Sequence, residues 1–392
     1  MSIQNDLFIE NLVQKIKSVL PIKDKFIPLH EPSFTGNENK YVKECIDTGW
    51  VSSVGKYVDL FEKNLANYTG VKRAVAVVNG TAALHISMVL AGVKAKDEVI
   101  VPALTFIATA NAVSYCNAVP HFADSAMSTL GMDPVKLDRY LNEIVEIREG
   151  ISYNKQTNRR ISAVVPMHTF GHPVDLDKMV EVCEKYHLVL IEDAAESIGS
   201  FYKGKHTGNL GKVTALSFNG NKTITTGGGG AILTNDEDLG MLAKYLTTQA
   251  KVPHRWKFRH DMIGYNYRMP NINAALGCAQ LEQLSEFIEK KRRLAERYEQ
   301  IFTEIEGISF FKEPAFAKSN YWLNVMLLDE IYADKREDVL TALNDNNIMA
   351  RPVWDLMYTM PMYEQCPRME CSVAETISRR LINLPSSVVL EK

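Results

Sequence analysis

The sequence has few cysteines, and they are not arranged as a disulfide framework or a zinc site. Its six cysteines are scattered without a C-x-x-C pair: Cys45, Cys116, Cys183, Cys278, Cys366 and Cys371. Scattered cysteines of this kind are typical of reduced, mostly buried thiols. We therefore expect a cytoplasmic protein without structural disulfides.

The sequence also lacks a long hydrophobic run and a block of like charge. No stretch is apolar for long enough to span a bilayer, and residues 1–20 alternate charged and apolar side chains as a short amphipathic helix does. Lys and Arg number 44 against 47 Asp and Glu, which gives a net charge of -3. We expect neither a membrane nor a nucleic acid as partner.

Two nucleotide-binding motifs are missing as well. No P-loop and no G-x-G-x-x-G occurs at the end of an expected strand, so ATP and dinucleotide chemistry have no support. The chain is large, and its 392 residues are long enough for two or three domains. A hydrophobic content of 46% is enough for a large core.

Short β-branched runs alternate with segments of helical length over the first two thirds of the chain. Most of the runs are continuously apolar, as strands buried on both faces are. We expect strands near Ala74–Val78, Glu98–Val101, Pro120–Ala123, Ala163–Pro166, Leu188–Glu192, Val213–Phe218 and Ala231–Thr234. We expect crossover helices at Thr81–Leu90, Phe106–Tyr115, Leu176–Tyr186 and Leu239–Thr247. This pattern predicts an α/β fold with a mainly parallel sheet of seven strands.

The pattern changes after about Lys251. Pro270 can begin a long helix that runs into the charged segment Glu289–Arg293, which we interpret as a solvated helix face. Beyond it we expect a strand at Tyr321–Leu328 and helices at Lys335–Asn344 and Ile377–Leu384. These elements indicate a smaller C-terminal α+β domain. The expected division is an N-terminal helical extension (1–26), a large α/β domain (27–251) and the smaller domain (252–392), with a charged surface excursion between Leu141 and Ile161.

Lys222 is the most informative single residue. It follows the expected buried strand Val213–Phe218 and precedes four glycines, Gly227 to Gly230, where the absence of side chains lets the backbone approach a bound group. A lysine there can form a Schiff base with pyridoxal phosphate (PLP) and move protons during the reaction. The alternative is that the glycines merely form a hairpin and Lys222 is a surface charge.

Three other strand ends supply groups that fit the same cofactor. Asp193 ends an apolar strand and could hold a protonated pyridine nitrogen, or could be the N-cap of a helix that starts at Ala194. Gly80 and Thr81 open a helix whose amides could bind a phosphate together with Ser217, although Thr81 could equally be a cap. Phe106 could stack on the pyridine ring or belong to the core.

A metal site is not favoured. His168 and His172 are four residues apart, but Gly171 and Pro173 interrupt any helix that would bring them onto one face.

Five motifs in order resemble the DegT/DnrJ/EryC1/StrS family of PLP-dependent sugar aminotransferases. They are Asn79–Leu84, Pro102–Phe106, Glu192–Glu196, Ser217–Lys222 and Gly264–Met269, and the resemblance runs from roughly Ile27 to the C-terminus. It implies PLP as cofactor, the aspartate aminotransferase fold (fold type I), and a homodimer with active sites at the subunit interface.

The resemblance also implies a role for individual residues. Lys222 matches the Schiff-base lysine, Asp193 the partner of the pyridine nitrogen, and Phe106 the stacking aromatic. The remaining matches are the phosphate cradle (Gly80, Thr81 and Ser217), a residue beside the cofactor hydroxyl (Glu196), a cofactor-site residue in the lysine motif (Asn219), an asparagine that reaches the neighbouring subunit's cofactor phosphate (Asn266), and a histidine on the substrate side (His168).

The reaction implied is transfer of an amino group, usually from glutamate, to a keto sugar carried on a nucleotide. The N-terminal helix, Gly49–Lys56 and the insertion around Asn154–Arg160 are similar to aminotransferases of legionaminic acid biosynthesis, a surface-glycan pathway. Those act at C4 of a nucleotide-linked 4-keto-6-deoxy sugar such as UDP-2-acetamido-4-keto-2,6-dideoxyhexose.

Several alternatives stay open. They are a 3-keto sugar aminotransferase, a PLP-dependent sugar dehydratase, which Lys222 speaks against, and a non-catalytic sugar-nucleotide sensor. The loop Arg351–Trp354 resembles one that contacts the nucleotide sugar, but Tyr358 stands where related enzymes often have a histidine. The motifs leave the choice between UDP and GDP open.

Overall fold

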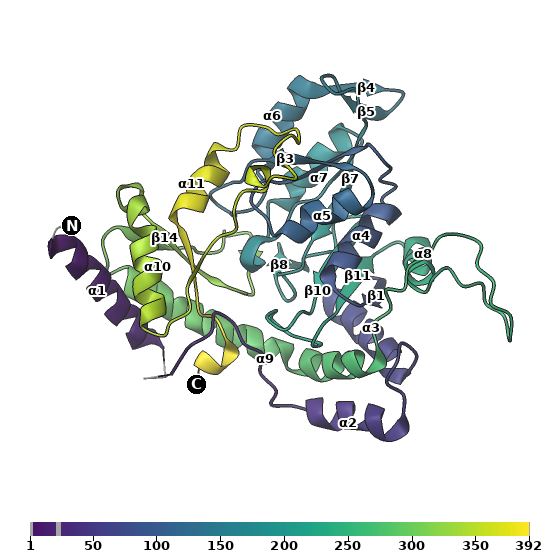
Figure 1. Cartoon of the computed structure of the whole chain (residues 1–392), viewed down its shortest axis with the longest axis horizontal. Coiled ribbons are helices and arrows are strands. Elements are labelled where there is room, and N and C mark those ends of the chain that lie inside the picture. The colour runs from purple at the N-terminus through teal and green to yellow at the C-terminus, as the bar shows by residue number, and fades with distance from the viewer. Residues whose placement is uncertain (1–2, 21–24, 392) are drawn as a thin grey trace.

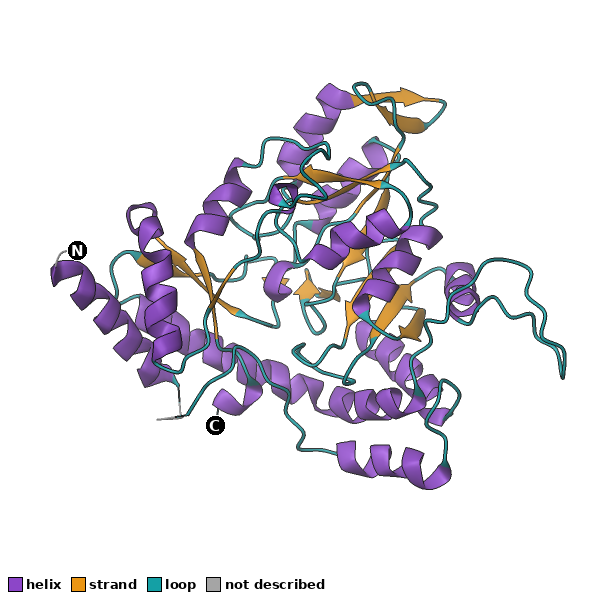
Figure 2. Cartoon of the chain, viewed as in Figure 1, coloured by secondary structure: helices purple, strands orange, loops and turns teal. Residues whose placement is uncertain are grey.

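A computed structural model of the protein describes residues 3–20 and 25–391. Its centre is a seven-stranded sheet in the order β1-β11-β10-β7-β6-β2-β3 (Figures 1 and 2). The strands in that order are β1 (Arg73–Val77), β11 (Gly230–Thr234), β10 (Val213–Ser217), β7 (Val189–Asp193), β6 (Ile161–Val164), β2 (Glu98–Pro102) and β3 (Val119–Ala123). Only β11 runs antiparallel to its neighbours. The seven strands predicted from apolar runs are these seven.

Helices cover the sheet because the connections between parallel strands must cross over its faces. They are α4 (Gly80–Leu90), α5 (Ile107–Tyr115), α6 (Pro134–Ile144), α7 (Leu176–Lys185) and α8 (Glu237–Thr247). The sheet and these helices share one large apolar core. Residues at the carboxyl ends of the parallel strands therefore meet along one edge, where ligands bind in α/β folds.

The excursion between Leu141 and Ile161 contains a small hairpin, β4 (Val145–Arg148) and β5 (Ile151–Asn154), at the top of Figure 1. Its two turn residues, Glu149 and Gly150, both have positive φ, the geometry of a tight two-residue hairpin loop. The buried carboxylate of Glu98 anchors the segment by accepting bonds from Asn154 (2.9 Å) and Thr157 (2.6 Å).

A second, four-stranded antiparallel sheet lies in the C-terminal part, in the order β12-β14-β16-β15. Its strands are β12 (Ile308–Phe310), β14 (Asn324–Leu328), β16 (Leu381–Leu384) and β15 (Arg351–Pro352). The helix predicted over Ile377–Leu384 is confirmed only for Ile377–Arg380, because α11 (Ser372–Arg380) ends there and Leu381–Leu384 form a fully buried strand. That strand pairs with β14 and β15, and this pairing outweighs the helical pattern of the preceding residues.

The remaining elements surround and connect the two sheets. The helices are α2 (Glu38–Thr48), α3 (Lys56–Thr69) and α10 (Arg336–Asp345), with short 3-10 turns at Thr169–Gly171, Glu330–Lys335, Met357–Thr359 and Val388–Leu390. A small sheet combines β13 (Ala317–Lys318), β8 (Phe201–Tyr202) and β9 (Lys205–His206).

The long helix α9 (Asn271–Phe302) connects the two halves of the molecule. In the charged run Glu289–Arg293, the interpretation as a solvated face is wrong for Lys291, which is 1% exposed. Its ammonium group donates to the main-chain oxygens of Trp322 (3.2 Å) and Ser386 (2.6 Å). Burial lowers the pKa of Lys291 well below its usual value. The helix thus ties together two segments that reach the site described below.

The division into domains at residues 26 and 251 remains an interpretation. Residues after 251 still belong to the larger half: Val78 donates a main-chain bond to Tyr267, and the first turns of α9 pack against α3. Within the described residues, no helix combines the length and apolarity needed to cross a bilayer.

The N-terminal helix α1 (Ile3–Val19) packs against α9 and α10 through an apolar face that includes Leu12, Val13 and Ile16. Leu12 is completely buried, whereas Leu7 on the same helix is 60% exposed. Leu12→Ala should lower the free energy of unfolding by about 2–4 kcal/mol, because it leaves a cavity in a packed core.

The matched control Leu7→Ala should change the free energy of unfolding by less than about 0.5 kcal/mol. Urea unfolding followed by circular dichroism compares the two variants. Equal effects would show that α1 does not dock through this face.

Candidate active site

A cavity of about 310 Å³ lies at the carboxyl ends of the central strands. Its walls come from the first turn of α4, the start of α5, and the segments that follow β7 and β10. Eight of the predicted site residues line it together: Gly80, Thr81, Phe106, Asp193, Glu196, Ser217, Asn219 and Lys222.

Asp193 supplies a buried carboxylate to this cavity. It is the last residue of β7, is 2% exposed, and accepts hydrogen bonds from the Thr109 hydroxyl (2.7 Å) and the Ala195 amide (3.2 Å). Burial raises its pKa despite the opposing effects of Thr109, Ala195 and Lys222. A cation in the cavity would offset that desolvation, so the group is suited to hold a protonated ring nitrogen.

Lys222 projects into the same cavity between an acid and an aromatic ring. Its amine lies 3.2 Å from a carboxylate oxygen of Glu196 and 3.8 Å from the ring centroid of Trp322. Such a position over an indole face favours a cation. Trp322 is itself fixed, because its indole N–H donates to the main-chain oxygen of Asn221 (2.7 Å).

Glu196 is a second buried carboxylate with a raised pKa at this site. Burial raises its pKa to about 7, although the charge of Lys222 opposes the shift. The second carboxylate oxygen accepts from the Phe170 amide (2.9 Å), and Phe170 has the unusual φ of 55°. The strained turn at Phe170 therefore directs an amide at the carboxylate beside Lys222.

Another part of the cavity lining, at the start of α4, suits a phosphate. The first amides of a helix have no partner within it, and Gly80 and Thr81 provide such amides at the start of α4. The Asn79 side chain caps this helix by accepting from the Ala82 amide (2.7 Å). A Cβ at Gly80 would lie only 2.8 Å from the Cβ of Ser217, so glycine is required for the two segments to approach.

Together these groups fit PLP: a lysine amine, a buried carboxylate for the ring nitrogen, and a helix start with a serine for the phosphate. Phe106, which is 49% exposed, stands at the cavity wall where it could stack on a ring.

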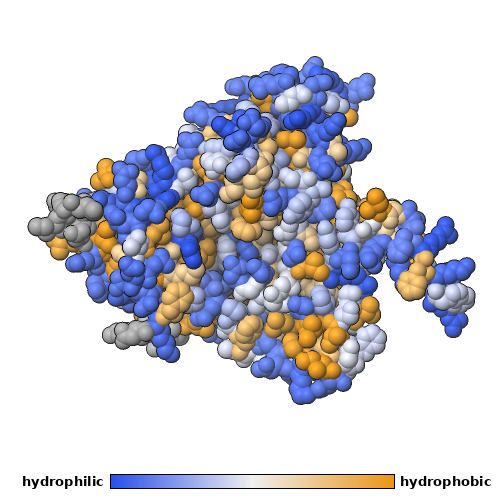
Figure 3. All heavy atoms as spheres, viewed as in Figure 1, coloured by the Kyte–Doolittle hydropathy of each residue, from blue (hydrophilic) through white to orange (hydrophobic). Residues whose placement is uncertain are grey.

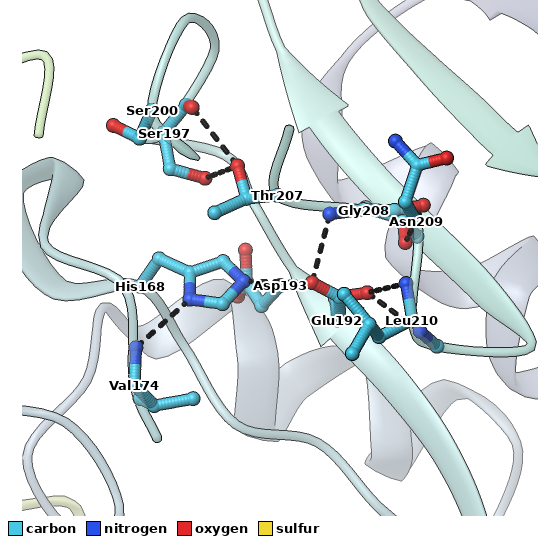
Figure 4. A network of polar contacts seen from close by, with 12 residues as sticks. His168, Val174, Glu192, Asp193, Ser197, Ser200, Thr207, Gly208, Asn209 and Leu210 are labelled. Carbon is cyan, nitrogen blue, oxygen red and sulfur yellow. Dashed lines mark hydrogen bonds and ion pairs between the residues drawn. The ribbon is translucent and has the colours of Figure 1, made fainter. Parts of the chain in front are cut away.

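His168 lies elsewhere, contrary to the expectation that it faces the substrate. His168 is not among the described residues that line the cavity. Its ring lies 3.0 Å from a carboxylate oxygen of Glu192, and its other nitrogen accepts from the Val174 amide at 3.3 Å (Figure 4). Successive residues of a strand point to opposite faces, so Glu192 and His168 lie behind Asp193. His168 can position Asp193, because its own amide donates to the Asp193 carbonyl (3.1 Å).

His172 has a separate environment, with its ring 2.8 Å from the Ser319 hydroxyl. Across the part of the chain that the structure describes, no group of three or more metal-ligating side chains is gathered.

Asn266 is exposed and does not line the cavity formed by the described residues of its own chain. It belongs to an arm, Thr248–Pro270, between α8 and α9. Both ends of the arm contact the body, since the Tyr265 amide donates to the Leu246 carbonyl and Met269 is buried, whereas its tip projects from the body at the right of Figures 1 and 3. Its place in the fold is compatible with a role in a second subunit, which the sequence resemblance implies.

Three contacts at the site were not predicted. Thr109 had no assigned role, although it follows Thr105 by one helical turn and bonds to Asp193. Trp322 contributes its ring from a distant part of the chain, so no local pattern indicated it. Trp354, expected only in a nucleotide-sugar loop, also lines the cofactor cavity and lies 5.0 Å from the Phe170 ring.

The raised pKa of Glu196 predicts a pH effect on stability. In the ligand-free protein the folded state keeps this proton up to about pH 7, whereas the unfolded chain releases it near pH 4.5. The free energy of unfolding should therefore fall as pH rises through that window, by at most about 1.4 kcal/mol per pH unit from this group.

Glu196→Gln should remove that part of the slope. Urea unfolding of wild type and variant at about pH 5 and about pH 8 measures the difference. Identical pH dependence in the two proteins would show that Glu196 ionises normally.

The family comparison identifies the chain. The profile of the DegT/DnrJ/EryC1/StrS aminotransferase family matches residues 32–392. A GDP-perosamine synthase from Escherichia coli O157:H7 is 41% identical over 362 residues, which cover 92% of this chain and 93% of that protein. A putative pyridoxal phosphate-dependent aminotransferase, EpsN, from Bacillus subtilis (strain 168) is 39% identical over 366 residues, covering 92% and 91%.

Solved structures agree with this result. The aminotransferase TlmJ from Streptoalloteichus hindustanus superposes with a TM-score of 0.83 at 27% identity, covering 94% of this chain and 95% of that one. Helicobacter pylori PseC, an aminotransferase of pseudoaminic acid biosynthesis, has the same TM-score at 25% identity, covering 92% and 94%. The chain belongs to the DegT/DnrJ/EryC1/StrS family and is a PLP-dependent nucleotide-sugar aminotransferase of fold type I.

Proposed function

We propose that the protein transfers an amino group from glutamate to C4 of a nucleotide-linked 4-keto-6-deoxy sugar. Three relatives named GDP-perosamine synthase, 38–41% identical over 92% of this chain, support the C4 position because perosamine is a 4-amino sugar. They also favour GDP over UDP as the nucleotide. The similarity to legionaminic acid enzymes remains a prediction.

The observation that carries the proposal is the amine of Lys222, held by Glu196 and Trp322 in a cavity that also contains Asp193. PLP supplies a carbonyl that can exchange for an amine and a ring that withdraws electrons. Asp193 would keep a proton on the ring nitrogen. Lys222, once released, would carry a proton between the substrate carbon and the adjacent carbon of the cofactor.

Other residues would bind and orient. The amides of Gly80 and Thr81 and the hydroxyl of Ser217 would hold the phosphate, and Phe106 would cover one face of the ring. Glu196 would lie beside the cofactor hydroxyl while Trp322 keeps the released lysine amine near the reacting carbon. His168 would act through the backbone of Asp193 as a positioning residue. Asn219 lines the same cavity.

We also propose a homodimer with shared sites. The arm that contains Asn266 exposes large apolar side chains: Trp256 (69%), Phe258 (83%) and Ile263 (84%). Exposed apolar side chains of this size favour burial against another surface. A second copy of the chain would bind the arm, and Asn266 of that arm would then reach the cofactor phosphate of the second copy.

The sugar specificity can be tested by following the absorption band of the bound cofactor. Glutamate should bleach the band, and a GDP-linked 4-keto-6-deoxyhexose should restore it faster than UDP-2-acetamido-4-keto-2,6-dideoxyhexose. Lys222→Ala serves as the control and should show neither response.

Recovery of the band with the UDP sugar alone would show that the substrate carries UDP and not GDP. A band that bleaches but returns with neither sugar would refute amino transfer to a 4-keto sugar. A wild-type protein that forms no band with added PLP would refute the catalytic assignment altogether.

Shared sites can be tested by mixing inactive subunits. Lys222→Ala and Asn266→Ala should each be inactive alone, whereas a hybrid dimer should contain one site with both native residues. Random exchange in equal amounts should therefore restore about a quarter of the wild-type sites. No recovery, with exchange confirmed by native mass spectrometry, would mean that each site draws both residues from its own chain.

A further inference from the structure

A second cavity, of about 620 Å³, adjoins the cofactor cavity. The two share four walls: Phe106, Asn221, Trp322 and Trp354. The second cavity thus lies next to the one that contains the Lys222 amine, and it is the larger of the two. Arg351 and Asp355 add charged groups to its lining.

Two polar side chains in its lining have unmet hydrogen-bonding capacity. Within the described residues, three buried atoms have no hydrogen-bond partner: the two ring nitrogens of His30 and the side-chain oxygen of Asn383. Most buried polar atoms in folded proteins are paired, because leaving one unpaired costs about 1–3 kcal/mol. Two such residues on one cavity indicate a ligand that would pair them.

The environment of His30 determines what kind of group could pair with it. Burial and the nearby charges of Lys291 and Lys222 lower its pKa well below the usual value. The Asn221 main chain lies close enough to oppose this shift in part, but it does not meet hydrogen-bond geometry with either ring nitrogen. The ring is therefore neutral near pH 7. A neutral imidazole offers one N–H donor and one acceptor, which complements a hydroxyl group and gives no advantage to a phosphate.

The backbone around both residues is fixed. The Leu29 carbonyl accepts from the Ser386 amide (2.9 Å), and the Glu31 amide donates to the Ser387 hydroxyl (2.9 Å). Asn383 lies within β16 and donates its side-chain amide to the Pro352 carbonyl (3.4 Å), which leaves the oxygen unpaired.

We propose that His30 and Asn383 form a subsite for the hexose ring of the nucleotide sugar. His30 hydrogen-bonds one ring hydroxyl, and the Asn383 oxygen accepts a hydrogen bond from another. A site whose buried polar groups need these hydroxyls discriminates against sugars that lack them. The subsite rests on the proposed function, since it requires a keto sugar next to Lys222.

The test compares His30→Phe, which keeps a ring but removes both polar atoms, with His30→Gln, which keeps a donor and an acceptor. The probe is the nucleotide sugar that restores the cofactor band of the wild type, with the free nucleoside diphosphate as reference. Calorimetric titration should show about tenfold weaker binding of the sugar to His30→Phe and unchanged binding of the diphosphate.

The bleaching rate with glutamate should stay at the wild-type value in both variants, and His30→Gln should recover most of the sugar affinity. Asn383→Leu should weaken sugar binding without affecting the diphosphate. Unchanged sugar affinity in His30→Phe, or an equal loss for the diphosphate, would refute the subsite alone. A wild type that responds to glutamate but to neither sugar would refute the proposed function and the subsite with it.

Discussion

The desolvation of Asp193 is the constraint on which the site depends. Its neighbour Glu192 is equally buried, but three amides (Gly208, Leu210 and Gly211) and the His168 ring surround its carboxylate. These partners hold the pKa of Glu192 below its usual value although burial alone would raise it. Asp193 has only Thr109 and Ala195, and its pKa is raised. The Glu192 carboxylate thus has its hydrogen-bond partners within the protein. The Asp193 carboxylate can pair with a cationic group in the cavity, which a protonated ring nitrogen provides.

The groups expected to hold the cofactor come from strand ends, because these ends meet at one edge of the central sheet. Other side chains that line the two cavities come from segments outside this sheet. Trp322, Trp354 and His30 reach the cavities from segments near the C-terminal sheet and from the N-terminal part of the chain. Lys291 holds the Trp322 and Ser386 carbonyls from the middle of α9, and Ser386 in turn bonds to Leu29. A buried lysine with two carbonyl acceptors therefore keeps the indole over Lys222 and the His30 segment in one arrangement. Such a group is costly to bury, and removing it would take a donor from both carbonyls, although the Trp322 carbonyl would still accept from the Ser386 hydroxyl (2.5 Å).

The sequence was sufficient for the central sheet, because continuous apolar strands are a local signal, and residues predicted at strand ends, such as Asp193 and Lys222, do line one cavity. Glu196 and Asn219, which line it as well, were indicated only by the family resemblance. The sequence was not sufficient where the outcome depended on pairing between distant segments. Leu381–Leu384 continues a helical pattern but pairs with β14 and β15, and Lys291 lies in a charged run but meets two carbonyls. The orientation of His168 depends on which face of β7 each carboxylate occupies. The positions of Trp322 and His30 depend on the tertiary structure, and no local pattern encodes them.

The two cavities separate two kinds of selectivity. The cofactor cavity contains groups that any amino transfer with PLP needs, and the sugar enters their chemistry only through its ketone. In the adjoining cavity, His30 and Asn383 would select hydroxyl groups on the proposed subsite, and Arg351 and Asp355 add charged groups to the lining. Substitutions there should exchange one sugar for another at constant chemistry, since they change ground-state contacts remote from the reacting carbon. The shared walls, Phe106, Asn221, Trp322 and Trp354, are the exception: a change at Trp322 alters the sugar cavity and the contact to the Lys222 amine together.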